Sequence, residues 1–371
     1  MDASGRALSV FFDQTISAIE PAAKGDVGLL LTPGFLDVQV NGFAGVDFNS
    51  PQTSHEQIAY ATRVIRQTGV TRYFPTVITG DPEKMGASLR NLANAREAIA
   101  ERASIEAFHV EGPHICERDG PRGAHPREWV CEPDIDLFHR LQDAAQGHIR
   151  LTTVSPHWSG APRYIEAVVK TGVVVSLGHT DANAQQIDDC VRAGATMSTH
   201  IGNGADSVMR RHPNYLWDQL ADDRLMAGLI VDGIHLGQAF LKVAVRAKGV
   251  ERSVLVTDAS TPAGCAPGRY RLGQQDVDLR EDGSVVLAGQ DRLAGSALKM
   301  NDAVLKVMQL AGVSLADAVQ MASVNPAKAC RIEGHQNGLA VGDVADLVLF
   351  ENEGGRLEAK QMWIDGEPVT L

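Results

Sequence analysis

The middle of the chain alternates short apolar runs with segments that have helical periodicity. The apolar runs are rich in β-branched residues and nearly continuous, as is typical of strands buried on both faces. There are eight of them, at residues 35–40, 71–78, 105–112, 149–156, 173–180, 196–201, 227–235 and 253–260. Eight such strands alternating with helices predict a closed parallel (β/α)8 barrel of the TIM type, with a doubly wound open sheet as the alternative.

Helix signals stand between the apolar runs. Ser54 and Gln57 fit a capping box ahead of an apolar helical face. Asp181 is the predicted N-cap of another helix, which we expect to end at Gly194, and Ser314 opens a third. These segments supply the connections that a parallel barrel needs.

The two ends of the chain differ from its middle. Residues 1–32 and 339–371 are typical of short strands separated by glycine turns, and they carry few helix signals. We expect the two ends to pair into one small β-sandwich domain. It would stand beside a barrel domain that spans residues 33–338.

Composition narrows the classes of function. The formal net charge of -12 argues against a nucleic-acid partner, which requires a basic face. An anionic substrate would therefore have to be attracted by a few local cations. No run approaches ~20 uninterrupted apolar residues, so no membrane partner is expected. The five cysteines are widely spaced and form no C-x-x-C pair, which predicts reduced thiols in a cytoplasmic protein.

Polar side chains gather at the carboxyl ends of the predicted strands. Glu111 lies at the end of the third run, His179 of the fifth, His200 of the sixth and Asp258 of the eighth. Strand ends of a barrel face one mouth, so these distant residues should converge. Each alone would more often be structural, but a carboxylate with two imidazoles can bind a divalent metal and leave positions open for water and substrate.

A further carboxylate next to such a metal suits hydrolysis. Asp258 could take a proton from metal-activated water and return it to a leaving amine. Gln39 and Asn41, after the first strand, and His235, at the end of the seventh, face the same mouth. Competing chemistry is not indicated, because the chain has no G-x-S-x-G elbow, no P-loop and no G-x-G-x-x-G at the start of a βαβ unit.

A set of short motifs resembles a known family. The motifs are PGFLDVQVNG at 33–42, HVEGPHI at 109–115, GAH at 123–125, GHT at 178–180, TH at 199–200, DGIH at 232–235 and VTDA at 256–259. Together they resemble the N-acetylglucosamine-6-phosphate deacetylases of the amidohydrolase superfamily. The resemblance covers nearly the whole chain in the same order.

The resemblance implies roles for individual residues. Glu111, His179 and His200 correspond to the metal ligands, and Asp258, with His235, to the catalytic groups. Most amidohydrolases carry H-x-H after the first strand, whereas residues 39–41 read Gln-Val-Asn here. Amides bind zinc poorly compared with imidazole, so we expect one divalent metal ion per subunit, Zn²⁺. The implied substrate contacts are Ala124, His125, Asn203, Gly204, Arg211, His235, Leu293, Ala294 and Gly295.

The implied substrate is an amino-sugar phosphate, and Arg211 implies a homodimer. Arg211 resembles an arginine that binds phosphate across the subunit interface, and a guanidinium suits phosphate because its forked donors match two oxygens. The leading hypothesis is therefore a small-molecule deacetylase of amino-sugar metabolism, which converts N-acetylglucosamine-6-phosphate into glucosamine-6-phosphate and acetate.

Departures from the family pattern keep two alternatives open. The loops at 202–205 and 210–214 differ from the family's sequence, while the metal ligands do not. One alternative is an amidohydrolase for an unphosphorylated N-acyl amino sugar or a cyclic amide. The other is a non-catalytic barrel that serves as a binding or scaffold protein.

Overall fold

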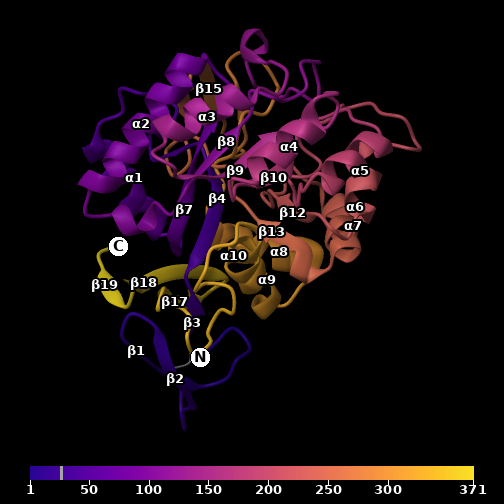
Figure 1. Cartoon of the computed structure of the whole chain (residues 1–371). Coiled ribbons are helices and arrows are strands. Elements are labelled where there is room, and N and C mark those ends of the chain that lie inside the picture. The colour runs from indigo at the N-terminus through magenta and orange to yellow at the C-terminus, as the bar shows by residue number, and fades with distance from the viewer. Residues whose placement is uncertain (26–27) are drawn as a thin grey trace.

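All eight predicted barrel strands are present in the structure, a computed structural model that describes residues 1–25 and 28–371. They lie side by side in one sheet (Figure 1). The strands are β4 (Phe35–Val40), β7 (Val70–Ile78), β8 (Phe108–Glu111), β9 (Ile149–Val154), β10 (Val174–Leu177), β11 (Met197–Ser198), β12 (Met226–Leu229) and β13 (Ser253–Leu255). The predicted runs were generally longer than these strands because their last residues form loops at the mouth.

The order of the strands establishes a closed barrel. Successive strands are neighbours, in the order β13-β12-β11-β10-β9-β8-β7-β4, and every pair is parallel. A parallel bridge between Val40 and Ala259 joins the two ends, with the Asn41 N–H donating to the Ala259 carbonyl at 2.7 Å. The prediction of a (β/α)8 barrel is confirmed, and the open-sheet alternative is wrong, since such a sheet has two free edges.

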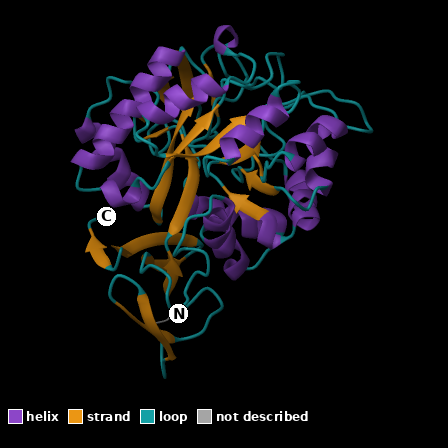
Figure 2. Ribbon diagram, in the orientation of Figure 1, coloured by secondary structure: helices purple, strands orange, loops and turns teal. Residues whose placement is uncertain are grey.

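Helices cover the outside of the barrel, as Figure 2 shows in purple around the orange strands. Ser54 forms the predicted capping box, and Ser314 opens its helix as predicted, there too with a capping box. Asp181 does not cap: Asn183 does, because its side chain accepts from the Gln186 N–H. The helices are α1 (His55–Arg66), α2 (Pro82–Ala98), α3 (Ile135–Ala144), α4 (Ala161–Val169), α5 (Ala184–Arg192), α6 (Tyr215–Ala221), α7 (Gln238–Lys248), α8 (Met300–Ala311), α9 (Leu315–Ala322) and α10 (Val324–Ala329).

Strands from the two chain ends pair with each other, at the bottom of Figure 1. A four-stranded antiparallel sheet has the order β19-β18-β17-β3, and β1 pairs with β2. The strands are β1 (Leu8–Phe12), β2 (Ile16–Pro21), β3 (Leu29–Pro33), β17 (Leu347–Glu353), β18 (Arg356–Ile364) and β19 (Glu367–Val369). The predicted small β unit built from both ends is confirmed, while its division from the barrel at residues 32 and 339 stays a prediction.

A three-stranded antiparallel sheet between β13 and α8 was not predicted. It consists of β14 (Gly268–Leu272), β15 (Gln275–Leu279) and β16 (Val285–Leu287), and a short hairpin of β5 (Gly42–Phe43) and β6 (Val46–Asp47) follows β4. The segments GRYRL and QDVDL carry too few apolar residues to stand out as strands. The sheet nevertheless has its own apolar cluster, which includes Leu272, Val277, Val285 and Ala294.

Arg72, on β7, joins the barrel to the β unit. Its guanidinium pairs with Asp346 at 2.6 Å, with Asp365 at 2.6 Å and with Glu106 at 2.8 Å. The Arg72 side chain is 12% exposed and that of Asp346 is 2% exposed. Removal of the cation would therefore leave the buried Asp346 carboxylate without its guanidinium partner, with the Asp365 N–H still donating to it.

We expect Arg72→Met to lower the free energy of unfolding by about 3–5 kcal/mol, the usual cost of stranding one member of a buried ion pair. Chemical denaturation followed by circular dichroism would measure it. Arg246→Met, at an exposed position on α7, is the matched control and should change stability by less than about 0.5 kcal/mol. Equal stability of the two variants would contradict the role assigned to Arg72.

Candidate metal centre and active site

The residues predicted to carry the chemistry lie at the carboxyl ends of the barrel strands. Glu111 ends β8, and His179, His200 and Asp258 follow β10, β11 and β13. The backbones of the last three have positive φ angles of 49°, 26° and 49°, which non-glycine residues rarely adopt. Such conformations cost on the order of 1–3 kcal/mol each and cluster at functional sites. Here the strained turns stand where the chain leaves each strand for the mouth.

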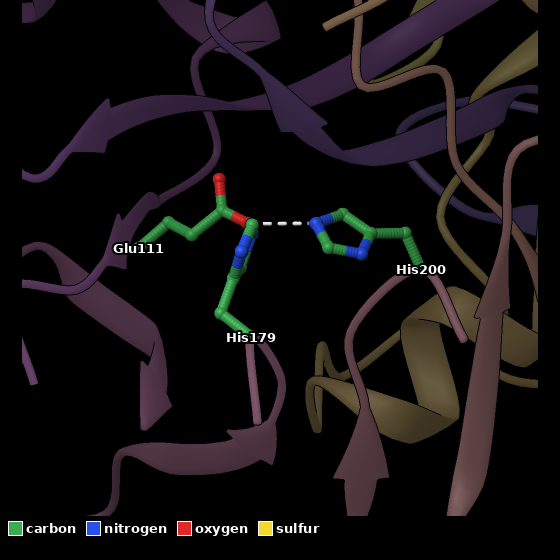
Figure 3. A group of neighbouring side chains, drawn as sticks. All are labelled: Glu111, His179 and His200. Carbon is green, nitrogen blue, oxygen red and sulfur yellow. Dashed lines mark hydrogen bonds and ion pairs between the residues drawn. The ribbon is translucent and has the colours of Figure 1, made fainter. Parts of the chain in front are cut away.

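Glu111, His179 and His200 converge on one point (Figure 3). Glu111 Oε1 lies 3.1 Å from His179 Nε2 and 2.8 Å from His200 Nε2, and all three side chains are buried. Ligand atoms about 2.0–2.1 Å from a tetrahedral zinc ion stand about 3.3 Å apart. The donor set therefore fits a divalent ion, provided that the three ligand atoms move slightly apart.

Neighbouring groups orient His179 toward Glu111. Its Nδ1 lies 2.8 Å from the Pro121 carbonyl, which can only accept, so Nδ1 carries a proton and Nε2 is the nitrogen that faces the centre and would bind a metal. Gly204 packs against the same ring. Its φ is +56°, and a Cβ there would lie 2.6 Å from His179 Nδ1, so the ring position requires glycine.

Glu111 carries the negative charge of this centre. Burial alone would raise the pKa of Glu111, but hydrogen bonds from His179 and His200 hold that pKa well below its ordinary value. In the described part of the chain, this carboxylate pairs with the two histidines. An ionised carboxylate among imidazoles, with no Lys or Arg paired to it there, suits a bound cation.

Asp258 is held by two amides from β4 and the residue after it. Gln39 Nε2 donates to Asp258 Oδ1 at 3.1 Å, and Asn41 Nδ2 donates to the same oxygen at 2.7 Å. Both amides are buried, and they lie on one face because residues two apart on a strand point the same way. This positioning role was missed from sequence, where residues 39 and 41 indicated only the loss of a second metal site.

The environment of Asp258 suits proton transfer. Burial and the nearby Glu111 carboxylate raise the pKa of Asp258 to about 6, against the lowering effect of His200, His235 and Asn41. A general acid or base works best when its pKa lies near the working pH. With Oδ1 occupied by the two amides, Oδ2 is the oxygen left for exchanging a proton.

Two further histidines are fixed at the same mouth. His235 Nδ1 lies 2.6 Å from Asp232 Oδ2, and His125 Nδ1 lies 2.8 Å from Thr79 Oγ1. Burial and the neighbouring His179 lower the pKa of His125 to about 3, so its ring is neutral. In each histidine the partner of Nδ1 leaves Nε2 to contact a ligand.

These side chains line one cavity of about 920 Å³, a volume suited to a small molecule. Most of the predicted site residues line it. They are Glu111, Ala124, His125, His179, His200, Asn203, Gly204, His235, Asp258, Leu293, Ala294 and Gly295. Arg211 is not among them: it lies exposed in the loop after β11, outside the cavity of its own chain.

Three cations at the cavity were not singled out from sequence. Lys84 belongs to α2, Arg271 to β14, and Arg292 to the segment after β16. None stands in a motif, and the β14–β16 sheet that presents Arg271 was itself not foreseen. A charged residue in a loop with no recognisable pattern carries no sequence signal that separates it from a solvated surface charge.

The arrangement of a barrel, a buried Glu-His-His centre and an anchored aspartate is that of a metal-dependent hydrolase. In agreement, residues 30–369 match the model of the amidohydrolase family, whose members are typically metal-dependent. The chain belongs to the amidohydrolase family.

Among the described helices, none combines the length and the apolar character needed to cross a membrane.

Within that family, the chain is similar to amino-sugar phosphate deacetylases. It is 34% identical to the N-acetylglucosamine-6-phosphate deacetylase of Bos taurus, over 97% of this chain and 88% of that one. It is 32% identical to the N-acetylgalactosamine-6-phosphate deacetylase of Escherichia coli O157:H7, over 97% and 93%. A Mycobacterium smegmatis N-acetyl-D-glucosamine-6-phosphate deacetylase mutant, solved with that sugar phosphate, superposes with a TM-score of 0.88 at 30% identity, over 97% of this chain and 94% of that one.

We expect Glu111→Gln to lose one equivalent of bound zinc per chain, because an amide replaces the only carboxylate of the centre. Even partners one step removed from a metal change its affinity by about 10–100-fold, so loss of a direct ligand should exceed about 100-fold. Metal content by mass spectrometry after dialysis would measure it. Glu128→Gln, an exposed carboxylate outside this centre, is the control, and an unchanged zinc content in Glu111→Gln would contradict the assignment.

Proposed function

We propose that this chain hydrolyses the N-acetyl group of N-acetylglucosamine-6-phosphate, giving glucosamine-6-phosphate and acetate. The observation that carries the proposal is the convergence of Glu111, His179 and His200 next to an amide-anchored Asp258, inside a cavity of about 920 Å³. The similarity to deacetylases along 97% of the chain supports the choice of substrate.

Glu111, His179 and His200 would hold one divalent ion, Zn²⁺. Such an ion activates water for attack and polarises the acyl carbonyl. Asp258 takes a proton from the attacking water and delivers it to the amine nitrogen, which leaves poorly unless protonated. The amides of Gln39 and Asn41 hold the carboxylate in position through both transfers.

The remaining cavity residues bind the sugar. His235 and His125 present ring nitrogens, and each is oriented by the hydrogen bond at its Nδ1. They can donate to the acyl oxygen and to a sugar hydroxyl. The other proposed contacts are Ala124, Asn203, Gly204, Leu293, Ala294 and Gly295, all at the cavity wall.

The phosphate would meet a small group of cations. Lys84, Arg271 and Arg292 line the cavity within the chain, which is otherwise acidic at -12. Arg211 is exposed and outside its own cavity, which supports its use in the cavity of a second copy. We therefore propose a homodimer in which Arg211 completes the partner's phosphate site. We also propose that the protein works in the reducing environment of the cytoplasm, which agrees with its five free cysteines.

A second question is whether the substrate is the glucosamine or the galactosamine epimer of the sugar. The galactosamine-type relative is nearly as similar, at 32% identity, as the glucosamine-type relatives at 34%. The two substrates differ only at one hydroxyl, so both epimers belong in the assay. Unphosphorylated N-acetylhexosamine and a cyclic amide test the other candidate substrates.

The wild-type protein should release acetate from N-acetylglucosamine-6-phosphate, and Asp258→Asn should lower kcat by about 10²–10⁴-fold while it retains zinc. The reason is that an amide cannot carry the proton to the leaving nitrogen. Enzymatic detection of acetate and metal analysis on the same preparation measure both. Asp291→Asn, a carboxylate on the cavity rim that is 94% exposed, is the control. A wild-type protein that binds zinc but releases no acetate would favour the non-catalytic alternative.

Arg211→Met should raise KM for the phosphorylated sugar by about 10–100-fold, because the variant loses one or more charged hydrogen bonds to the phosphate. KM for the unphosphorylated sugar should not change. Steady-state kinetics on the two substrates separates these effects, and the adjacent Arg210→Met serves as control. A wild-type preference for the unphosphorylated sugar would overturn the phosphate assignment.

A further inference from the structure

A second group of metal-ligating side chains lies beside the first centre. Cys116, His157 and Asp181 each offer a ligand atom, and these atoms lie within 4.8 Å of one another. The three residues follow three adjacent barrel strands, β8, β9 and β10. Cys116 is fully buried, and the side chains of His157 and Asp181 are each 16% exposed. The convergence therefore joins three loops that are far apart in sequence.

The spacing agrees with a tetrahedral ion. Cys116 Sγ and Asp181 Oδ1 are 3.4 Å apart. With Zn–S near 2.3 Å and Zn–O near 2.0–2.2 Å, tetrahedral geometry places sulfur and oxygen about 3.5 Å apart. The upper bound of 4.8 Å for the other pairs exceeds this separation by little more than about 1 Å, within reach of a side-chain adjustment.

The hydrogen bonds around His157 prepare it as a ligand. Ser155 Oγ donates its proton to Thr180 Oγ1 at 2.8 Å, so at His157 Nδ1, 2.7 Å away, it accepts. Nδ1 therefore carries the proton and Nε2 presents a lone pair, the arrangement common for metal-bound histidine. Glu117 Oε2 lies 3.1 Å from this Nε2, at the edge of the cluster, and its side chain would turn inward to serve as a further oxygen donor.

We propose that Cys116, His157 and Asp181, with Glu117 as the fourth donor, form a second, structural site for Zn²⁺. A thiolate, an imidazole and carboxylates are a donor set that zinc accepts, and four protein ligands close the site to substrate. The charges agree: a thiolate and two carboxylates carry three negative charges. Arg118, which pairs with Asp181 Oδ2, and Zn²⁺ together supply three positive charges.

This site would secure a wall of the substrate cavity. Cys116 and Glu117 belong to the loop between β8 and η2 (Arg127–Trp129), which also carries Gly123, Ala124 and His125 at the cavity. The Cys116 N–H donates to the His179 carbonyl at 2.9 Å, and Pro121 orients the His179 ring. An ion there would attach this loop to the ends of β9 and β10, next to the first centre.

The two proposed metal sites differ in their ligand atoms, so the ions bound at each can be counted separately. The wild-type chain should bind two zinc ions, and Cys116→Ser and His157→Gln should each bind one. Cys131→Ser, a partly buried thiol outside the cluster, should still bind two. With cobalt in place of zinc, a sulfur-to-cobalt charge-transfer band should appear in the wild type and in Glu111→Gln, because the first centre contains no sulfur. The band should be absent from Cys116→Ser.

A wild-type chain that binds a single ion and shows no sulfur-to-cobalt band would overturn the proposal. In that case Cys116 only donates to Asp181, and His157 only pairs with Glu117. This outcome is read from the wild-type protein, so it does not depend on whether a variant folds. It is also independent of the substrate, so the second site and the proposed deacetylation can fail separately.

Discussion

A buried carboxylate facing two imidazole nitrogens is the constraint on which the rest of the active site depends. Desolvation of Glu111 costs several kcal/mol unless a positive charge offsets it. The Pro121 carbonyl holds a proton of His179 on the far nitrogen, so Nε2 is the nitrogen left to bind a cation beside the carboxylate. The carboxylate and the two imidazoles together therefore suit a bound cation. The closed barrel, which directs distant strand ends to one mouth, is what brings them together.

The amides of Gln39 and Asn41 bear both on the number of metal ions that the site can bind and on proton transfer by Asp258. Imidazoles at these positions would be ligands for a second ion, which would compete for the Asp258 carboxylate. Amides are donors, and here both donate to a single oxygen of Asp258. In the proposed mechanism, the same two amides leave no second metal site at these positions and orient the group that would move the proton. Both consequences suit hydrolysis with one catalytic ion, since no second ion would then hold the aspartate.

The sequence predicted the barrel and the centre because both leave regular signals. Buried parallel strands are continuous apolar runs, and the residues after them share one mouth, so Glu111, His179, His200 and Asp258 could be grouped without coordinates. Contacts made through backbone groups, such as the Pro121 carbonyl on His179, leave no residue-type signal. The cap at Asn183 was missed because Asp181, two residues earlier, is equally suited to capping by type. The β14–β16 sheet was missed because β14 and β15 are mostly polar in sequence and β16 is only three residues long.

The same distinction explains why hydrolysis is easier to predict than the substrate. Over more than about 8 Å at physiological salt, the overall charge of -12 is largely screened, so nearby cations determine whether phosphate binds. Those cations come from α2, from the unpredicted sheet and from a loop, and Arg211 would come from another subunit. Their positions depend on how irregular segments fold and assemble, whereas the metal ligands depend only on the barrel. The proposed specificity for a phosphorylated substrate therefore depends on the irregular segments, whose structure is the hardest to predict from the sequence.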